Sequence, residues 1–554
     1  MISFIKIKPD VEMSRGLKSI KRDILRGFRS YLIQSNRYAP LYVANCQIYR
    51  LLEYFIKRFY SLVPGVKSIY LAHGLALGEL YPGLSDFDLA IIFESSQSQE
   101  FYTNLRSRWQ VIQRFLSARD IMLFTEQEFT LWQKFGGGWE PLDELKHWKL
   151  IYGHELRQSD WKLNSQQAKM DRLRYVLAKY HGLLYSAIKE EPKSPYLAIS
   201  ARRNLYKFFC YSVLPLKRKY LSIGNQYERL SQWIEDSEIK GSRVHELLKM
   251  SESRFQSGEI SNLKFSIGAI GYKVINDALE SFRRFHPPLP NGIPHDEMSI
   301  PLYNLREVEE RVSGLSSNIV ELLNERIASI MLISNGSAIG YTLLVILRAD
   351  LTIDEVEETL RTLHVIFRIY DDPWFNEHFP AKVPIVYSKS MFLTHLHVWP
   401  FDRSFAHFHR RVLYGKDLYQ ELMEDSPVIN YQNNLEYEIT RETLNFSRSL
   451  HQISLEKLKP ALYEAITLHF PRLYIFHKMG WTPTTTEEAL FYYEKLTDGK
   501  AINYPKVFVE KYGKKNMHDL EYAMSDDEFE KACAFLKDEF INNKLFNKNP
   551  EHGN

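Results

Sequence analysis

The sequence has few cysteines, no long apolar run and almost no excess of either charge. Its three cysteines, Cys46, Cys210 and Cys533, are far apart and odd in number, which argues against a zinc module and favours a reducing compartment. No uninterrupted apolar stretch approaches the length of a membrane helix, and the N-terminal segment lacks the apolar core of a signal peptide. These absences predict a cytoplasmic protein with no membrane partner.

The charge balance gives no sign of a nucleic-acid binder. Lysine and arginine number 71 against 68 aspartates and glutamates, so nucleic acid is a possible but not a favoured partner. Hydrophobic residues make up 45% and aromatic residues 14% of the sequence, which fits a globular protein. A chain of 554 residues is too long for one ordinary core, so about two to four domains are expected.

One stretch, from Ile69 to Phe93, organises the rest of the chain. It has the pattern of a strand, a glycine-bearing turn and a second strand that carries Asp86 and Asp88. Side chains two apart on a strand share a face, so the two carboxylates point to one place and repel each other. A hard cation such as Mg2+ (or Mn2+) offsets this repulsion and takes its other ligands from water and phosphate oxygens. The pattern is therefore typical of phosphoryl and nucleotidyl transfer, with Gly74 and Gly78 letting backbone N–H groups approach a triphosphate.

The segment HGLALGELYPGLSDFDL, residues 73–89, resembles the signature of the nucleotidyltransferase superfamily that includes DNA polymerase beta. It most resembles the aminoglycoside adenylyltransferases, whose pattern reads roughly GSLALGxxxPGxSDxDL. The resemblance implies that Asp86 and Asp88 bind the catalytic metal. It also implies that the turn holds nucleotide phosphate through His73, Gly74, Gly78 and Ser85.

The sequence departs from this signature at the Gly-Ser pair itself. Without a gap, His73 and Gly74 fill the two positions; with one deletion, Gly74 is the glycine and the serine is missing. Backbone donors of the turn are then the alternative source of the phosphate contact. The two aspartates also have a simpler interpretation, as a solvated turn before a core strand.

A third carboxylate is expected on a neighbouring strand, because two-metal transfer needs a ligand that also orients the incoming nucleophile. Asp120 is the candidate, since it directly precedes the apolar run 121–124, which has the pattern of a buried strand. Residues 101–116 supply a crossover helix between the two strands. The alternative for Asp120 is a surface aspartate at the entry of a strand.

A second region repeats the first. The strand–turn–strand pattern recurs at 328–350, and its second strand places Gly340 opposite Asp86 and Thr342 opposite Asp88. Further along, Val383 falls opposite Asp120, and LYGKDL (413–418) matches IYGHEL (151–156). We predict an internal duplication whose second copy has lost all three carboxylates and gives structural support, acceptor binding or dimer-like pairing. Chance similarity of two α/β units is the alternative.

The predicted fold is α+β: a nucleotidyltransferase-like mixed sheet with helices, plus a helical bundle, duplicated. The bundle carries a basic cluster that either meets the triphosphate or acceptor or forms one solvated face: Arg202, Arg203, Lys207, Lys217, Arg218 and Lys219. The expected parts are N-terminal helices (1–65), a catalytic domain (66–160), the helical bundle (161–285), a linker (286–300), a degenerate nucleotidyltransferase-like domain (301–425) and a C-terminal helical domain (426–554).

Four histidines form two HxH pairs, at His395, His397, His407 and His409. On strands, each pair would share one face and suit zinc or another transition metal. The surrounding phenylalanines and tryptophans favour packed or hydrogen-bonding histidines instead.

The predicted function is metal-dependent transfer of a nucleotide, AMP from ATP, onto a hydroxyl or less favourably an amine of an unidentified acceptor. The acceptor is a small molecule, a protein side chain or RNA; Mg2+ or Mn2+ is the implied cofactor. The alternative is a non-catalytic nucleotide-binding or regulatory protein of the same fold, favoured by the altered Gly-Ser pair and opposed by the carboxylates. A hydrolase is a third and weaker interpretation of the function, because no Ser-His-Asp or Cys-His context is evident.

Overall fold

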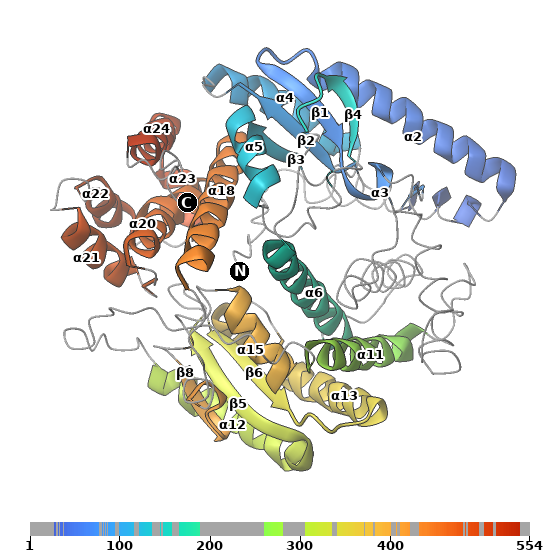
Figure 1. Ribbon diagram of the computed structural model, residues 1–554, viewed down its shortest axis with the longest axis vertical. Helices are drawn as coiled ribbons and strands as arrows, with labels where there is room; N and C mark the ends of the chain where they lie inside the picture. Colours follow the sequence, from blue (N-terminus) through green and yellow to red (C-terminus); the bar gives the residue numbers. More distant parts are fainter. Residues whose placement is uncertain are drawn as a thin grey trace.

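The computed structural model contains two sheets and many helices (Figure 1). It describes residues 27–28, 31–32, 34–36, 38–76, 80, 82–83, 85, 87–94, 99–115, 121–135, 145, 148–157, 165–188, 260–280, 305–334, 341–370, 372–379, 383–399, 406, 410–420, 431–479, 482–483, 486–497, 503–513 and 517–542. The predicted linker and the basic cluster lie outside these residues. Within them the fold is α+β with two mixed sheets, which confirms the predicted class.

The first sheet has the strand order β3-β2-β1-β4. Its strands are β1 (Val66–Leu71), β2 (Leu89–Phe93), β3 (Ile121–Thr125) and β4 (Lys149–Gly153). β1 is antiparallel to both β2 and β4, whereas β2 and β3 are parallel. A parallel pair needs a crossover, which α4 (Gln99–Phe115) supplies. Every residue of β2 and β3 is buried, which explains their uninterrupted apolar sequences.

Helices cover both faces of this sheet. Leu89 and Ile91 join the core under α2 (Ala39–Tyr60) and α4, whereas Ala90 and Ile92 join the core under α5 (Glu126–Phe135). Helix α2 packs through Tyr49, Ile56 and Tyr60. It falls within the predicted N-terminal helices, and its apolar residues Leu51 and Phe55 are exposed.

The second sheet has the order β7-β6-β5-β8, with the same strand directions as the first. Its strands are β5 (Ile327–Ser334), β6 (Tyr341–Leu347), β7 (Ile385–Ser388) and β8 (Arg410–Gly415). The surrounding helices are α12 (Leu305–Leu323), α13 (Ile353–Ile369), α14 (Pro373–His378) and α15 (Lys389–Val398), with the 3-10 turn η3 (Asn324–Arg326) before β5. Helix α13 begins at a capping box made by Thr352 and Glu355.

The two sheets share their irregularities as well as their strand order. The β1–β2 register shifts between Val66 and Ser68, and the β5–β6 register shifts between Ile327 and Ser329. In each sheet the register shifts again a little further along the first strand, in its pairing with the fourth strand. Bulges of this kind are specific features of a fold, so their recurrence makes the two units alike in detail.

Each unit also has a glycine in the left-handed region at the end of its last strand. Gly153 has a φ of 83° and Gly415 a φ of 77°. A Cβ on Gly153 would lie 1.8 Å from the carbonyl oxygen of Lys67, and one on Gly415 would lie 2.1 Å from that of Ala328. Only glycine fits at either place.

We expect Gly153→Ala to lower the free energy of unfolding by about 2 kcal/mol or more, because the backbone of β1 must move and φ is unfavourable. The matched control is Gly182→Ala, whose Cβ would meet nothing within 4 Å in a helix. That change should stabilise by about 0.5–1 kcal/mol. Denaturant unfolding measures both, and equal effects of the two substitutions would contradict the assignment.

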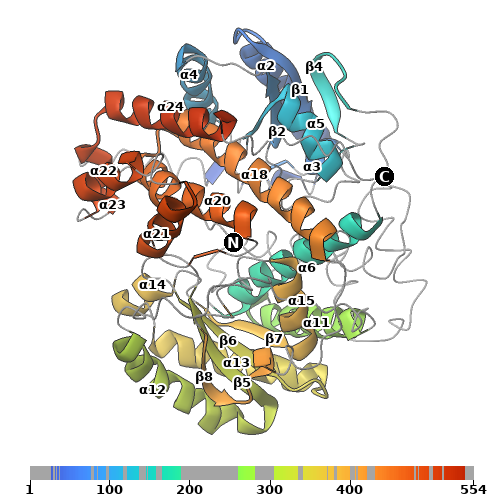
Figure 2. The same ribbon diagram turned by 60° about the vertical axis from the view of Figure 1, so that its left-hand side comes forward.

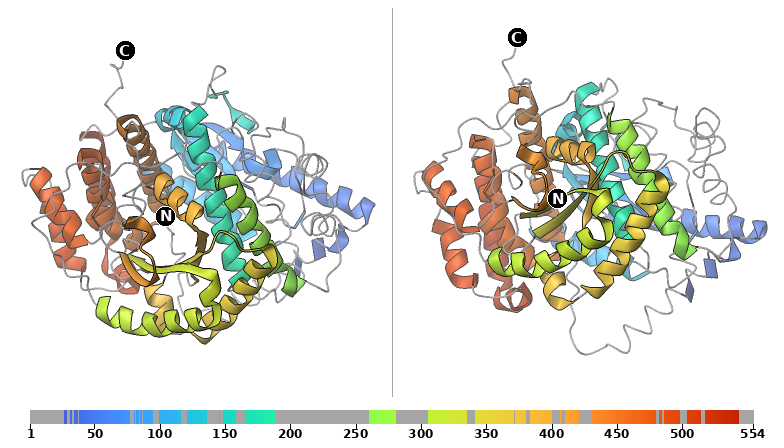
Figure 3. Two further views of the ribbon diagram at one scale, coloured as in Figure 1. Left: turned by 60° about the horizontal axis from the view of Figure 1, so that its bottom comes forward. Right: turned by 90° about the horizontal axis from the view of Figure 1, so that it is seen from below.

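The remaining helices pack on one of the two sheets or form a separate bundle. Helices α6 (Ser165–Ile188) and α11 (Ile260–Glu280) share one hydrophobic core with the second sheet, and they lie side by side (Figures 1 and 3). Helix α18 (Tyr431–Glu456) packs instead on α4, α5 and β3 of the first unit (Figure 2). It leads into a bundle with its own core, made of α19 (Lys459–Glu464), η4 (Ala465–His469), α20 (Phe470–Met479), α21 (Thr486–Leu496), α22 (Asn503–Tyr512), α23 (Met517–Ala523) and α24 (Asp526–Asn542).

Among the described helices, none combines the length and the apolar character needed to cross a membrane.

Candidate functional site

The predicted metal site lies where the chain enters β2. The carbonyl oxygen of Asp88 accepts a hydrogen bond from the Ala72 N–H, at 2.9 Å, which joins the end of β1 to the entry of β2. Phe87 is 3% exposed and shares the α2 core with Leu89, whereas Ala90 belongs to the α5 core. Because side chains alternate, the half-buried Asp88 lies on the Ala90 side of the sheet.

Three predicted pieces of the site meet at one edge of the first sheet. Leu89 of β2 pairs with Leu71 at the end of β1 and with Ile121 at the start of β3. Helix α3 (His73–Ala76) begins directly after β1 and contains His73 and Gly74. In the sequence, Asp88 directly precedes Leu89 and Asp120 directly precedes Ile121.

Several predicted site residues cannot be placed in this edge. Asp86, Asp120 and Gly78 lie outside the described residues, as does the side chain of His73. Ser85 is 3% exposed, and its carbonyl oxygen accepts a hydrogen bond from Tyr49. Its contact with a nucleotide stays a prediction, as do the metal contacts of the aspartates.

The loop before Asp88 is tied to the N-terminal helical segment by hydrogen bonds. The Tyr49 hydroxyl donates to the Ser85 carbonyl oxygen at 2.9 Å and accepts from the Gly83 N–H at 3.0 Å. Asn36 donates to the carbonyl oxygen of Pro82 at 2.9 Å. Gly83, with a φ of 87°, supplies the turn that this loop needs.

The sequence analysis did not predict this role of the N-terminal helices. A signal existed: Asn45 and Tyr49 are polar residues on the buried face of α2. Asn45 is 6% exposed and donates to the side chains of Ser35 and Asn36 at 2.9 Å. Buried polar groups at such positions are hydrogen-bonded, and here their partners lead to the loop.

We expect Tyr49→Phe to cost about 1–3 kcal/mol of stability, because two buried main-chain groups of the loop lose their partner. The stacked contact between Tyr49 and Phe87, with ring centroids 5.5 Å apart, should survive the change. Tyr54→Phe is the matched control, because Tyr54 lies on the same helix and is 60% exposed. Thermal unfolding compares the two variants, and an equally small effect of both would show that the hydroxyl does not hold the loop.

A second polar network lies at the far end of β3. The Thr125 hydroxyl accepts from the Glu128 N–H at 3.1 Å, and the Glu128 carboxylate accepts from the Thr125 N–H at 2.7 Å, so the pair forms a capping box for α5. From α18, the Ser447 hydroxyl donates to this carboxylate and His451 Nε2 lies 2.9 Å from it. The Tyr102 hydroxyl lies 2.7 Å from His451 Nδ1.

This network keeps Glu128 ionised although it is 6% exposed. Burial alone would raise the pKa of Glu128, but the charge of His451 and hydrogen bonds from His451, Ser447 and Thr125 lower the pKa to about 2. Sequence reasoning did not identify the network. The capping-box spacing from Thr125 to Glu128 was visible, but nothing local pointed to α18, more than 300 residues away.

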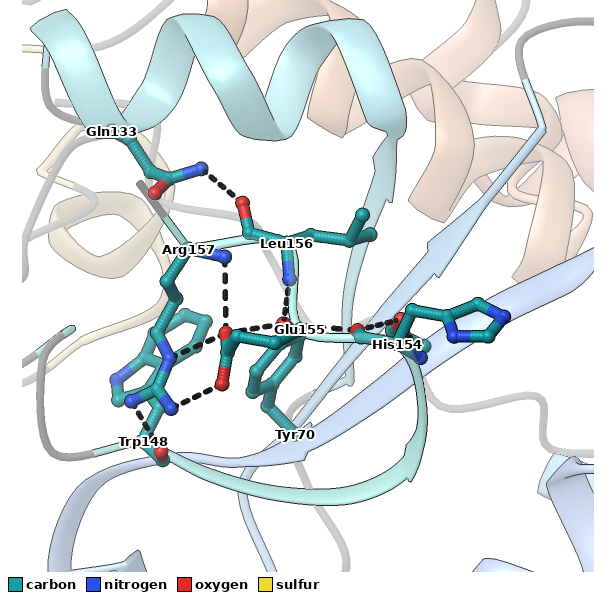
Figure 4. A network of polar contacts seen from close by, with 8 residues as sticks. Tyr70, Gln133, Trp148, His154, Glu155, Leu156 and Arg157 are labelled. Atoms are coloured by element: carbon teal, nitrogen blue, oxygen red, sulfur yellow. Dashed lines mark hydrogen bonds and ion pairs between the residues drawn. The ribbon is translucent and has the colours of Figure 1, made fainter. Parts of the chain in front are cut away.

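A third network fixes the chain where it leaves β4 (Figure 4). The Glu155 carboxylate accepts from the Arg157 guanidinium, at 2.7 Å from Nε, and from the Tyr70 hydroxyl at 3.0 Å. Arg157 also donates to the carbonyl oxygen of Trp148 at 2.8 Å. The hydrogen bond from Arg157, stronger than the opposing effect of burial, lowers the pKa of Glu155 to about 2. In the second unit, Asp417 pairs with Arg410 at 2.8 Å, soon after the end of β8.

The second unit carries no carboxylate at the described positions that match the metal site. Thr342 is half-buried in β6 and Val383 is 8% exposed before β7, while Gly340 lies outside the described residues.

The first HxH pair lies on a helix and not on a strand, which favours the packed interpretation over a metal site. His395 and His397 belong to α15, a helix that begins at Ser388, whose side chain accepts from the Met391 N–H. Residues two apart on a helix do not share a face, so this pair lacks the geometry that the metal alternative requires. His395 is buried and its Nδ1 lies 2.8 Å from the Tyr387 hydroxyl, as in the packed alternative. His407 and His409 lie outside the described residues.

Across the residues that the structure describes, no three histidine, cysteine or acidic side chains are grouped so as to hold a metal ion. Two of the three predicted metal ligands are not among those residues.

Comparisons with protein-family models, curated proteins and solved structures found no match for this chain. The function is therefore argued from the residues and the strand geometry.

Proposed function

We propose that this chain is a metal-dependent nucleotidyltransferase, which moves AMP from ATP onto a hydroxyl of an acceptor. The observation that carries the proposal is the parallel β2–β3 register. It pairs Leu89 with Ile121, and each residue directly follows a predicted metal-binding aspartate in the sequence. Parallel strands start at the same edge of a sheet, so this register supports a shared site for carboxylates from both strands.

The Asp88 carboxylate would supply hard oxygen ligands of the kind that Mg2+ prefers, and the carboxylates of Asp86 and Asp120 would complete the set. When bound, the metal neutralises charge on the triphosphate and activates the alpha phosphorus. Asp120 would accept the proton of the acceptor hydroxyl, whose oxygen forms a bond with the alpha phosphorus. The bond from that phosphorus to the bridging oxygen breaks, and pyrophosphate leaves. Helix α3 and the loop fixed by Tyr49 would orient the nucleotide.

The proposal includes a duplication with a degenerate second copy. Support comes from the shared strand order, the shared bulges and the left-handed glycines Gly153 and Gly415. A buried serine adds to it: the Ser68 hydroxyl donates to the carbonyl oxygen of His154 at 2.6 Å, and the Ser329 hydroxyl to that of Lys416 at 2.8 Å. These shared details favour the duplication over chance similarity of two α/β units.

Incubation of the purified protein with Mg2+ or Mn2+, cell extract and each of four NTPs labelled at the alpha phosphate tests the proposal. Separation of the products by size then shows whether the label enters a macromolecule or a small metabolite, and so names the acceptor class. We expect label from ATP. No label from any nucleotide, together with tight nucleotide binding, would replace the proposal by the non-catalytic alternative.

A further inference from the structure

Helix α18, which follows the second unit in the chain, lies on the first unit. Besides the contacts of Ser447 and His451 with Glu128, the Arg106 guanidinium of α4 donates to the carbonyl oxygen of Leu455, at 2.6 Å from Nε. The Leu455 side chain is fully buried in the core under α2 and α4. The end of α18 is thus part of the core of the first unit.

Helix α6, which follows the first unit, lies in the same way on the second. It packs on α13, α15 and β7, which take the places of α4, α5 and β3. The Tyr180 hydroxyl donates to the carbonyl oxygen of Val386 in β7 at 3.0 Å. His181 contacts the Tyr387 hydroxyl, and Leu177 and Leu184 are buried in the core of the second unit.

We infer that the two halves of the chain are paired by an exchange of helices: α18 completes the first unit and α6 completes the second. Each helix occupies, on the other unit, the face made by the crossover helix, the third strand and the helix after it (Figures 1 and 2). The inference rests on these contacts and not on the transferase proposal. In this arrangement the second half of the chain supplies a helix that the first unit needs to complete its core.

The two exchanged helices also contact each other through buried charges. Arg174 of α6 pairs with Glu438 of α18, which also pairs with Arg441 at 3.1 Å; the three side chains are 2%, 7% and 3% exposed. Burial alone would raise the pKa of Glu438, but the two arginines lower it. Arg174 donates in addition to the carbonyl oxygen of Val398 at the end of α15. A buried ion pair tolerates little displacement, so it fixes how the helices cross.

Hydrogen exchange of the intact protein, resolved by peptide, tests the exchange of helices. His451→Ala in α18 should raise amide exchange about tenfold or more in 121–135 of the first unit, beyond any change in 327–347. Tyr180→Phe in α6 should raise it in 385–398 of the second unit and not in 121–135. Each variant therefore loosens the sheet of the other half.

The control is Ser449→Ala, because the Ser449 hydroxyl donates within α18, to the Asn445 carbonyl oxygen. If each variant loosens only the sheet of its own half, the inference is wrong. Should His451→Ala fail to fold, Ser447→Ala replaces it, with the same peptides expected to respond. The readout needs no enzymatic activity, so a failed transferase proposal and a failed exchange are told apart.

Discussion

Replacing Asp88 with asparagine lowers the rate of nucleotidyl transfer about a thousandfold or more, while the fold is retained. The carboxylate is expected to hold the metal in the transition state, where such a contact contributes several kcal/mol, and each ~1.4 kcal/mol is worth tenfold in rate. Asparagine keeps the size of the side chain and leaves the hydrogen bond between the Asp88 carbonyl and the Ala72 N–H intact. Steady-state kinetics at saturating Mg2+ measures the loss, and Asp86→Asn should behave alike.

The second unit supplies the matched control. Thr342 stands opposite Asp88 in the repeat and is half-buried at the start of β6. Thr342→Ala should leave the transfer rate within about twofold of the wild type, since no metal is expected there. A loss comparable to that of Asp88→Asn would mean that the second unit carries the chemistry, and retained activity in Asp88→Asn would remove the metal assignment.

Replacing His451 with alanine costs about 3–5 kcal/mol of stability, because it leaves the buried Glu128 carboxylate charged and without its main partner. The second unit shows an apolar residue at the position that matches Glu128. Glu128 lies three residues after the cap of α5, Thr125, and the residue three after the cap of α15 is Met391, which is fully buried. The double variant Glu128→Met, His451→Leu should recover part of the loss, because it removes the buried charge together with its main partner. The recovery is incomplete because the Ser447 and Tyr102 hydroxyls and the Thr125 N–H each lose a hydrogen bond. Denaturant unfolding of the two variants and the wild type tests this non-additivity.

The same pair predicts how stability depends on pH. The folded-state pKa of Glu128, about 2, lies below its ordinary value of 4.5. A lowered carboxyl pKa contributes stability that is complete above the ordinary value and is lost as the pH falls toward the folded value. Stability should therefore fall between about pH 4.5 and 2 more steeply in the wild type than in Glu128→Gln. Equal slopes would show that the carboxylate is not held by α18.

Local patterns in the sequence located the elements of the candidate site. The apolar run after Asp88 predicted β2, the run after Asp120 predicted β3, and the amphipathic stretch between them predicted α4. The ends of each predicted element lie within two residues of those in the structure. These elements are encoded by neighbours in the chain: a fully buried strand needs an apolar run, and parallel strands need a crossover. The repeat gave the second sheet for the same reason.

Tertiary partners could not be predicted in this way. Nothing near His451 says that it faces Glu128, and nothing in α6 says that it lies on the second unit rather than the first. Buried polar residues that hold another segment, such as Tyr49 of α2 whose hydroxyl contacts the loop before β2, look like ordinary core positions. The HxH spacing alone does not decide between strand and helix, whereas the helix cap at Ser388 does.

The central claim is that the bond between the alpha phosphorus and the bridging oxygen breaks. ATP labelled either at the alpha or at the gamma phosphate, incubated with the purified protein, Mg2+ and extract, tests this directly. The account predicts that the alpha label enters the product and the gamma label leaves in pyrophosphate, with neither outcome in Asp88→Asn. Gamma label in the product would identify a phosphoryl transferase instead, and no transfer of either label would contradict the proposed function.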